Sequence, residues 1–268
     1  MNFKSLEFIR NKNIFNKKFY FILFAIIIAI IIFSYLKSPK IKYEGILNFE
    51  DIKKDVEVYF DDFGSPHIFA KNNDDLFFTA GYLMARERLF QLTINAYTSE
   101  GKLSEILGEE SVEIDKFIRT WGIPKVSKEM INDLDENSLN ILNKFCEGIN
   151  KYIAELENNL PIEFKILQIK PIKWKPYHIS GFSKLMAYSL SQSWHPEMLF
   201  GKVASMMGAK KTLELWPYFP NEKPNKLPEI KFDNFNIWEE IVNVDKKIRK
   251  ILGTASGHLG SNSWVVDG

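Results

Sequence analysis

Residues 257–268 read GHLGSNSWVVDG, and the interpretation of the whole chain depends on this stretch. A glycine-spaced turn leads into Ser261, and an apolar run with two β-branched valines follows at once. This pattern is typical of a turn that enters a strand. On these residues alone, a polar turn before a strand is the simplest interpretation, and a reactive serine at the junction is the alternative.

The composition of the chain excludes several classes of function. Of its 268 residues 46% are hydrophobic, which is enough for a sizeable core. Lys and Arg number 35 against 34 Asp and Glu, so no overall field attracts nucleic acid, and no nucleic-acid partner is expected. Cys146 is the only cysteine, which excludes an internal disulfide. The four histidines lie too far apart in sequence for a zinc-binding pattern.

The N-terminal residues predict a membrane anchor. Five basic residues within positions 1–18 precede an apolar run from Phe19 to Leu36 that only Ser34 interrupts. Eighteen helical residues span about 27 Å, close to the hydrocarbon thickness of a bilayer. No small-x-small cleavage motif follows, so an uncleaved anchor is favoured over a cleaved signal peptide. The positive-inside rule then makes residues 1–18 cytoplasmic and the rest periplasmic or otherwise extracytoplasmic, with the lipid bilayer as a partner.

The body of the chain predicts a β-hairpin followed by helices, an α+β fold. Residues 56–60 and 67–70 alternate like strands on either side of the turn residues 61–66. Apolar spacing predicts helices over about 72–95, 137–158, 180–207 and 231–252, with a short helical turn at 103–108. Four prolines between positions 217 and 228 predict an extended connector.

Charged residues within these helices are open to two interpretations. Arg86 and Arg88 lie either on a solvated face or, if covered, next to a buried carboxylate, because an unpaired buried charge is unstable. Glu197 follows an aromatic and methionine-rich segment. It is either a surface group or a metal ligand whose partners come from elsewhere.

Taken in order, these segments resemble the penicillin acylase (penicillin amidase) family of N-terminal-nucleophile hydrolases. Six blocks carry the resemblance: DFGSPHI at 62–68, DLFFTAGYLMARERLFQL at 75–92, GKLSEILG at 101–108 with Asp115 and Arg119, LPIEF at 160–164, PIKWKP at 171–176 and GSNSW at 260–264. The resemblance covers roughly residues 45–268. It implies a parent fold with a four-layer αββα sandwich, of which this portion is mostly helical with an N-terminal hairpin.

The family resemblance implies a precursor that cuts itself between Gly260 and Ser261. Residues 19–36 would then be the anchor, 37–48 a linker, 49–215 the α-chain region, 216–260 a linker or spacer, and 261–268 the start of the β chain. A serine hydroxyl needs a base, and a free α-amine with a pKa of about 7.7–8.0 accepts a proton near neutral pH. Ser261 would therefore supply nucleophile and base together. Glycine at position 260 allows a close, strained approach of its carbonyl group.

The same resemblance implies partners and ligands. The partners are the chain's own β chain and a small linear amide, such as a penicillin side-chain amide or an N-acyl-homoserine lactone. The chemistry needs no cofactor, and Glu197 matches the position of a family ligand to structural calcium. Residues 186–194 are expected to contribute to the acyl pocket, and the oxyanion hole lies outside this sequence. The portion alone is expected to be inactive; the alternative is a non-catalytic, membrane-anchored helical interaction module or a degenerate fragment.

Overall fold

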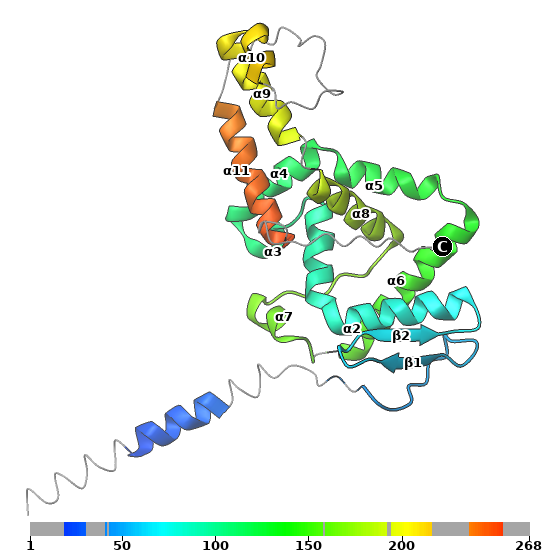
Figure 1. Ribbon diagram of the computed structural model, residues 1–268. Helices are drawn as coiled ribbons and strands as arrows, with labels where there is room; N and C mark the ends of the chain where they lie inside the picture. The colour runs from blue at the N-terminus through cyan, green and yellow to red at the C-terminus, as the bar shows by residue number, and fades with distance from the viewer. Residues whose placement is uncertain are drawn as a thin grey trace, which may run out of the picture. The chain divides into compact units, whose positions relative to one another are not determined.

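The computed structural model describes residues 19–30, 41, 43–157, 159–191, 194–215 and 236–253 (Figure 1). A helix covers residues 19–30, and a hairpin and a series of helices follow. Their bounds are β1 (Glu57–Phe60), β2 (Pro66–Phe69), α2 (Asn73–Ser99), α3 (Ser104–Leu107), η1 (Glu109–Ser111), α4 (Val112–Thr120), α5 (Ile123–Asn132), α6 (Glu136–Leu156), α7 (Ile162–Leu167), α8 (Pro176–Leu190), α9 (Trp194–Met207), α10 (Ala209–Leu215) and α11 (Asn236–Ile251). The predicted α+β class is confirmed.

The predicted hairpin is also confirmed. Strands β1 and β2 are antiparallel, with Glu57 opposite Phe69. The carboxylate of Asp61 accepts the backbone N–H groups of Phe63 and Ser65 at 3.0 and 2.8 Å, and Gly64 has φ +76°. An aspartate that caps its own turn and a glycine with positive φ are local features, so this element could be predicted from the sequence.

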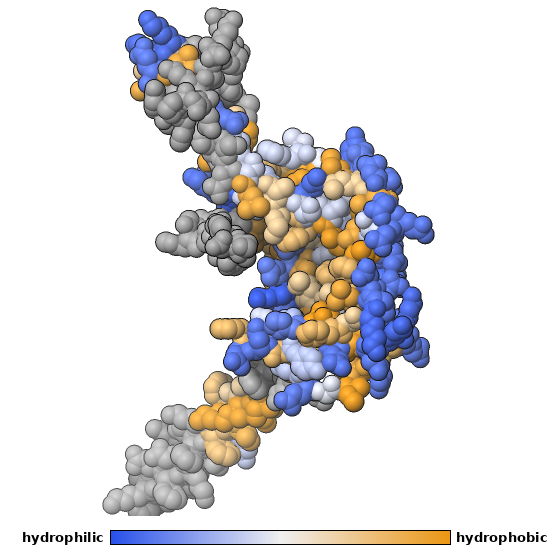
Figure 2. All heavy atoms as spheres, turned by 45° about the vertical axis from the view of Figure 1, so that its right-hand side comes forward, coloured by the Kyte–Doolittle hydropathy of each residue, from blue (hydrophilic) through white to orange (hydrophobic). Residues whose placement is uncertain are grey.

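The N-terminal anchor predicted for residues 19–36 is contradicted by the structure. Among the residues that the structure describes, no helix is long and apolar enough to cross a membrane. The helix over 19–30 is hydrophobic on the face seen in Figure 2, and residues 31–36 of the predicted anchor lie outside the described residues. The prediction of a membrane anchor, and of the localisation that depended on it, is therefore wrong.

The helix predicted over 180–207 is two helices. Helix α8 ends at Leu190, Ser191 adopts an extended conformation (φ −76°, ψ 106°), and α9 begins at Trp194. Pro196 explains the break, because a proline inside a continuous helix would clash with the carbonyl group four residues earlier and is tolerated only in the first turn. The apolar pattern continues across the break, which hid this boundary.

The chain divides into two compact units. The first comprises Met1–Phe90 and Glu147–Lys173, and the second Gln91–Cys146 and Trp174–Gly268. In the first unit α2 and α6 cross with their backbones almost touching, since a Cβ atom added at Gly148 would lie 1.9 Å from the carbonyl oxygen of Phe78. A glycine is required at such a crossing. Phe78, Tyr82 and Phe164 fill the core around it.

The core of the second unit draws on helices from both of its chain segments. Its buried residues are Leu103, Ile114, Ile118, Ile123, Leu185, Tyr188 and Ile248. Ile248 belongs to α11, which confirms the helix predicted over about 231–252. The proline-rich connector predicted at 217–228 lies outside the described residues.

Candidate functional site

The chemistry predicted for this chain centres on Gly260 and Ser261, which lie outside the described residues. The last described residue before them is Gly253. The structure therefore describes the helices that precede this segment in the chain. It also describes most of residues 186–194, which are expected to contribute to the acyl pocket.

Helix α8 presents an uncovered apolar face in that stretch. Leu185 and Tyr188 are buried, whereas Met186 and Leu190 are 50% and 75% exposed. Phe182, 37% exposed, lies one turn before Met186, so the three side chains follow one helix face at four-residue spacing. We call Phe182, Met186 and Leu190 the α8 stripe. Such a stripe could contact an apolar ligand or the remainder of the polypeptide.

Four aromatic rings adjoin the end of α8. Phe117 stacks on Trp121 with a centroid distance of 5.5 Å. Both rings meet Tyr188 edge-on, at 5.7 and 5.4 Å, and Trp121 lies 6.5 Å from Trp194 at the start of α9. Edge-on and stacked aromatic pairs stabilise beyond the area they bury. The α8–α9 junction is therefore held in place by side chains of α4 and by its C-cap residue Trp121.

A buried charge network joins α11 to the same end of α8. The guanidinium of Arg249 donates from Nε to both carboxylate oxygens of Asp245, at 3.1 and 2.9 Å. Its Nη1 and Nη2 donate to the carbonyl groups of Ser189 and Ser191, at 2.8 and 3.2 Å. The hydroxyl of Tyr188 donates to Asp245, and burial together with this bond raises the pKa of Tyr188. Carbonyl groups at a helix end lack intrahelical donors, and Arg249 supplies them here.

The residues of the block at 101–119 form a structural network. The carboxylate of Asp115 accepts the N–H groups of Leu103 and Ser104 at 2.7 and 2.9 Å. Arg119 Nε donates to the carbonyl group of Gly101 at 2.7 Å. Gly101 has φ +60°, and an added Cβ atom would lie 2.7 Å from Arg119 Cγ. This block therefore fixes the turn between α2 and α3.

A second buried network joins the end of α2 to the start of α8. His178 Nδ1 accepts the backbone N–H of Lys175 at 3.0 Å, so its proton is assigned to Nε2, which donates to Glu100 at 2.6 Å. Lys102 Nζ lies 2.6 Å from the other oxygen of Glu100. The bond from His178, opposed by burial and assisted by Lys102, lowers the pKa of Glu100 to about 2. The network positions α8 from its first turn.

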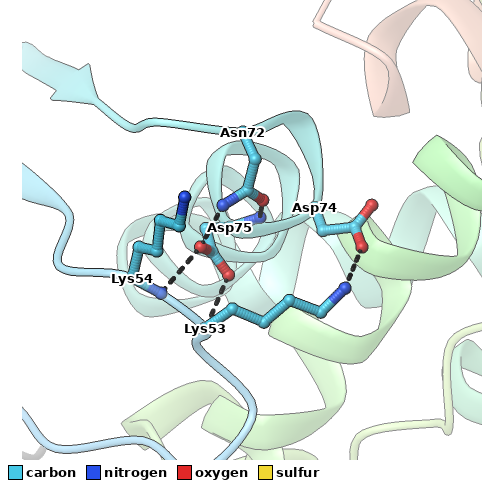
Figure 3. A network of polar contacts seen from close by, with 5 residues as sticks. All are labelled: Lys53, Lys54, Asn72, Asp74 and Asp75. Atoms are coloured by element: carbon cyan, nitrogen blue, oxygen red, sulfur yellow. Dashed lines mark hydrogen bonds and ion pairs between the residues drawn. The ribbon is translucent and has the colours of Figure 1, made fainter.

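In the first unit, the side chain of Asn72 caps α2, and the buried carboxylate of Asp75 binds Asn72 and the preceding chain (Figure 3). It accepts the N–H groups of Lys53 and Lys54, at 2.9 and 3.0 Å, and the side-chain amide of Asn72. Asn72 in turn accepts the N–H of Asp75 at 2.9 Å. Burial opposes ionisation of Asp75, but these bonds hold its pKa below the usual range. Asp74 pairs with the Lys53 ammonium at the surface, at 2.7 Å.

The structure decides between the two interpretations of Arg86 and Arg88. The Arg86 side chain is only 8% exposed, lies 3.0 Å from Glu87 and sits over the rings of Tyr43 and Phe60, at 5.2 and 5.1 Å. Arg86 is therefore covered and has a carboxylate partner, but that partner, Glu87, is exposed and not buried as predicted. Arg88 is exposed and has non-helical angles (φ −136°, ψ 25°) at a kink in α2.

The calcium ligand predicted at Glu197 stays a prediction. Glu197 is exposed in the first turn of α9. Within the described part of the chain, no group of three or more His, Cys, Asp or Glu side chains could hold a metal ion. Calcium takes six to eight oxygen ligands. One exposed carboxylate does not fit such a site by itself, so no step of the chemistry is assigned to a metal.

The hairpin, the ordered blocks and the glycine–serine junction together define a class of protein. A model of the penicillin amidase family matches residues 55–268, and the chain belongs to this family. This confirms the resemblance seen in the sequence.

Two curated relatives and one solved structure refine the comparison. The chain is 30% identical to penicillin G acylase from Escherichia coli over 54% of its own length and 18% of that protein. It is 23% identical to acyl-homoserine lactone acylase QuiP from Pseudomonas syringae pv. tomato, over 83% of its own length and 27% of the relative. The thermostable penicillin G acylase from Alcaligenes faecalis matches with a TM-score of 0.53 and 22% identity, over 65% of this chain and 97% of the matched chain. This last likeness shows the fold.

Sequence reasoning missed both long-range networks of the second unit. Asp245 and Arg249 are spaced i, i+4 on a helix, which is a readable signal for an ion pair. The carbonyl partners of Arg249 on α8 have no sequence signature. The sequence around His178 indicates only a helix that starts near Pro176. The partner of His178, Glu100, lies 78 residues away and has no local signal.

Proposed function

We propose that this chain is the N-terminal part of a self-processing amidohydrolase that hydrolyses linear amide bonds. The observation that carries the proposal is a difference in coverage. The chain spans 18% and 27% of two curated relatives, yet it covers 97% of a separate chain in the solved penicillin G acylase. A precursor that is cut into separate chains would produce that difference.

In this proposal Ser261 is the nucleophile, and the α-amine released by cleavage is its base. The amine takes the hydroxyl proton, directly or through a water, and the oxygen attacks the substrate amide carbonyl. The amine nitrogen of the leaving group receives a proton as the C–N bond breaks, which leaves an acyl-enzyme ester. Water then attacks the ester and releases the carboxylic acid. In the self-cleavage the same hydroxyl group attacks the Gly260 carbonyl, the Gly260–Ser261 C–N bond breaks with the proton going to the nitrogen, and water hydrolyses the resulting ester.

The substrates of the two curated relatives suggest the substrate class. Their names specify penicillin G and acyl-homoserine lactones, both of which contain an N-acyl amide. The α8 stripe gives an apolar surface in the stretch expected to contribute to the acyl pocket. We therefore propose an amide with an apolar acyl group as substrate. The second chain released by cleavage would be the partner of this one.

The test is to express the complete reading frame that contains this chain and to determine the N-termini of the products. A new chain that begins Ser-Asn-Ser-Trp is expected, and Ser261→Ala should leave only the uncut precursor. Ser261→Cys, which retains a nucleophile, is the matched control and should still be cut. Cleavage that persists in Ser261→Ala would remove Ser261 from the mechanism and favour the non-catalytic module.

The cleaved protein is then assayed against a penicillin with an aromatic acyl group and an N-acyl-homoserine lactone. Release of the free acid from either substrate supports the proposal, and failure with both would overturn the proposed substrate class.

A further inference from the structure

The hairpin of the first unit has unpaired outer edges. Among the residues that the structure describes, its sheet contains only β1 and β2, so neither outer edge has a strand beside it (Figure 1). A two-stranded sheet is only marginally stable by itself in water, and an open edge readily pairs with a further strand. The backbone groups along each edge determine which of the two is better suited to such pairing.

The turn fixes which backbone groups of β1 face outward. Opposite residues in an antiparallel ladder alternate between pairs that exchange both backbone hydrogen bonds and pairs that exchange none. The N–H of Asp61 donates to the carbonyl group of Ser65 at 3.2 Å, so the next pair, Phe60 with Pro66, is of the second type. Pro66 fits this position because it has no N–H to donate. The N–H and carbonyl groups of Phe60 therefore point away from β2.

The same alternation shows that the two edges are not equivalent. Val58 lies opposite Ile68, two positions further along the ladder, so this pair is of the same type as Phe60 with Pro66. The outer edge of β1 therefore offers the N–H and carbonyl groups of both Val58 and Phe60. The outer edge of β2 lacks one donor, because Pro66 occupies it, and proline is a common means of blocking an edge. The β1 edge is the better site for a further strand.

The outer face of the hairpin carries large exposed aromatic side chains. The opposite face is covered, with the guanidinium of Arg86 5.1 Å from the centre of the Phe60 ring. Tyr59 and Phe69 are 58% and 60% exposed, and their rings meet edge-on at 5.8 Å. Phe63, in the turn, is 94% exposed. Clustered exposed aromatic groups next to an open edge are typical of a surface that another polypeptide covers.

We propose that a strand of the second chain pairs with the outer edge of β1. This inference rests on the proposed function, which supplies that second chain. The length of the relatives favours this occupant, since the chain spans only 18% and 27% of two of them, and most of the proposed protein is therefore outside this chain. The N–H groups of Val58 and Phe60 donate to carbonyl groups of the added strand, and their own carbonyl groups accept in return.

The decisive experiment measures hydrogen exchange of single amides in the processed protein made from the complete reading frame. A paired amide exchanges only when the ladder opens. We expect the amides of Val58 and Phe60 to exchange at least about a hundredfold more slowly than that of Ile68, each relative to its rate in an unfolded peptide. Equal protection at the two edges, or protection of Ile68 alone, would contradict the proposal.

A second arm compares two prolines at opposite positions of the ladder. Val58→Pro removes an outward N–H that the hairpin itself does not use, and Ile68→Pro does the same on β2, so it is the matched control. We expect the two chains of the Val58→Pro protein to separate at least about tenfold faster in urea than those of Ile68→Pro, as measured by size-exclusion chromatography. Equal rates would contradict the pairing at β1. Protection of the Tyr59 and His67 amides reports whether the hairpin itself is intact in each variant.

The outcomes distinguish this inference from the proposed function and from other occupants. A parent that is not cut contradicts the proposed function. Protection of Val58 and Phe60 in that uncut polypeptide would still support the pairing, with the strand coming from the same continuous chain. A parent that is cut but leaves both amides unprotected contradicts this inference alone. Protection that appears only in a species with two copies of this chain, identified by its mass in sedimentation, would assign the edge to a second copy and overturn the proposed occupant.

Discussion

Asp75 in the first unit and Asp245 in the second are both almost completely buried carboxylates, and they organise the chain over different ranges. Asp75 binds backbone groups 21 and 22 residues away and the side chain of Asn72, next to its own helix start (Figure 3). Asp245 binds Arg249 one turn away and Tyr188, 57 residues away.

The difference separates a network that secures the start of one helix from a network that joins two helices far apart in the sequence. The Asp75 network is a helix cap extended by one neighbouring segment. The network of Asp245 ties the region before the predicted cleavage position to the helix that carries the α8 stripe. If this distinction is correct, disruption at Asp245 destabilises the protein more than disruption at Asp75.

The largest effect is expected for Asp245→Ala. The substitution leaves the guanidinium of Arg249 buried without its carboxylate and removes the acceptor of the Tyr188 hydroxyl. Loss of one partner of a buried pair typically destabilises by about 3–5 kcal/mol. The free energy of unfolding of a Ser261→Ala precursor, from denaturant titration, measures the effect. Lys246→Ala, at the exposed neighbouring position, should change it by less than about 0.5 kcal/mol.

An intermediate effect is expected for Asp75→Asn in the first unit. An uncharged amide has one acceptor oxygen, so one of the N–H groups of Lys53 and Lys54 keeps a neutral acceptor while the other faces the donor NH2 group, which destabilises by about 2 kcal/mol. Asp74→Asn is the matched control, because Asp74 pairs with Lys53 at the surface, and it should change stability by at most about 1 kcal/mol. If Asp75→Asn destabilised the precursor as much as Asp245→Ala, the contrast between the two networks would be wrong.

The sequence predicted the elements whose causes are local. Asp61 and Gly64 make the hairpin turn, and Asn72 with Asp75 starts α2. Each of these features depends on residues only a few positions apart, so it can be predicted from a short segment of sequence. Pro196 also marked the break between α8 and α9, but the continuous apolar pattern outweighed it. Apolar character alone also led to the predicted membrane anchor, whereas no helix among the described residues is long and apolar enough to cross a bilayer.

Long-range pairing could not be predicted in this way. The carbonyl acceptors of Arg249 on α8 and the partner of His178 depend on which helices pack together, and a backbone carbonyl group leaves no mark in a sequence. Ser261 and Glu197 stay predictions, the first because it lies outside the described residues and the second because its other ligands would have to come from elsewhere.

The smallest of the three effects is expected at Glu100, and it depends on pH. The pKa of Glu100 is about 2 in the folded protein, against 4.5 for an ordinary glutamate, chiefly because His178 donates to it. A lowered pKa means that the contribution to stability is complete above about pH 4.5 and is lost as the pH falls toward 2. Its size is about 1–2 kcal/mol once solvent screening of a partly exposed group is allowed for.

Glu100→Gln tests this contribution in the Ser261→Ala precursor. The variant should be less stable than the parent at pH 6. More than half of this difference in the free energy of unfolding should disappear by pH 3, because the parent there loses most of the stabilisation that the ionised Glu100 carboxylate gives. Unfolding curves at the two pH values measure the change, and Glu105→Gln, at an exposed position of α3, is the control with no expected pH-dependent difference. A difference that stayed constant between pH 6 and pH 3 would mean that Glu100 acts through packing alone. The bond from His178 would then orient α8 without storing charge-dependent stability.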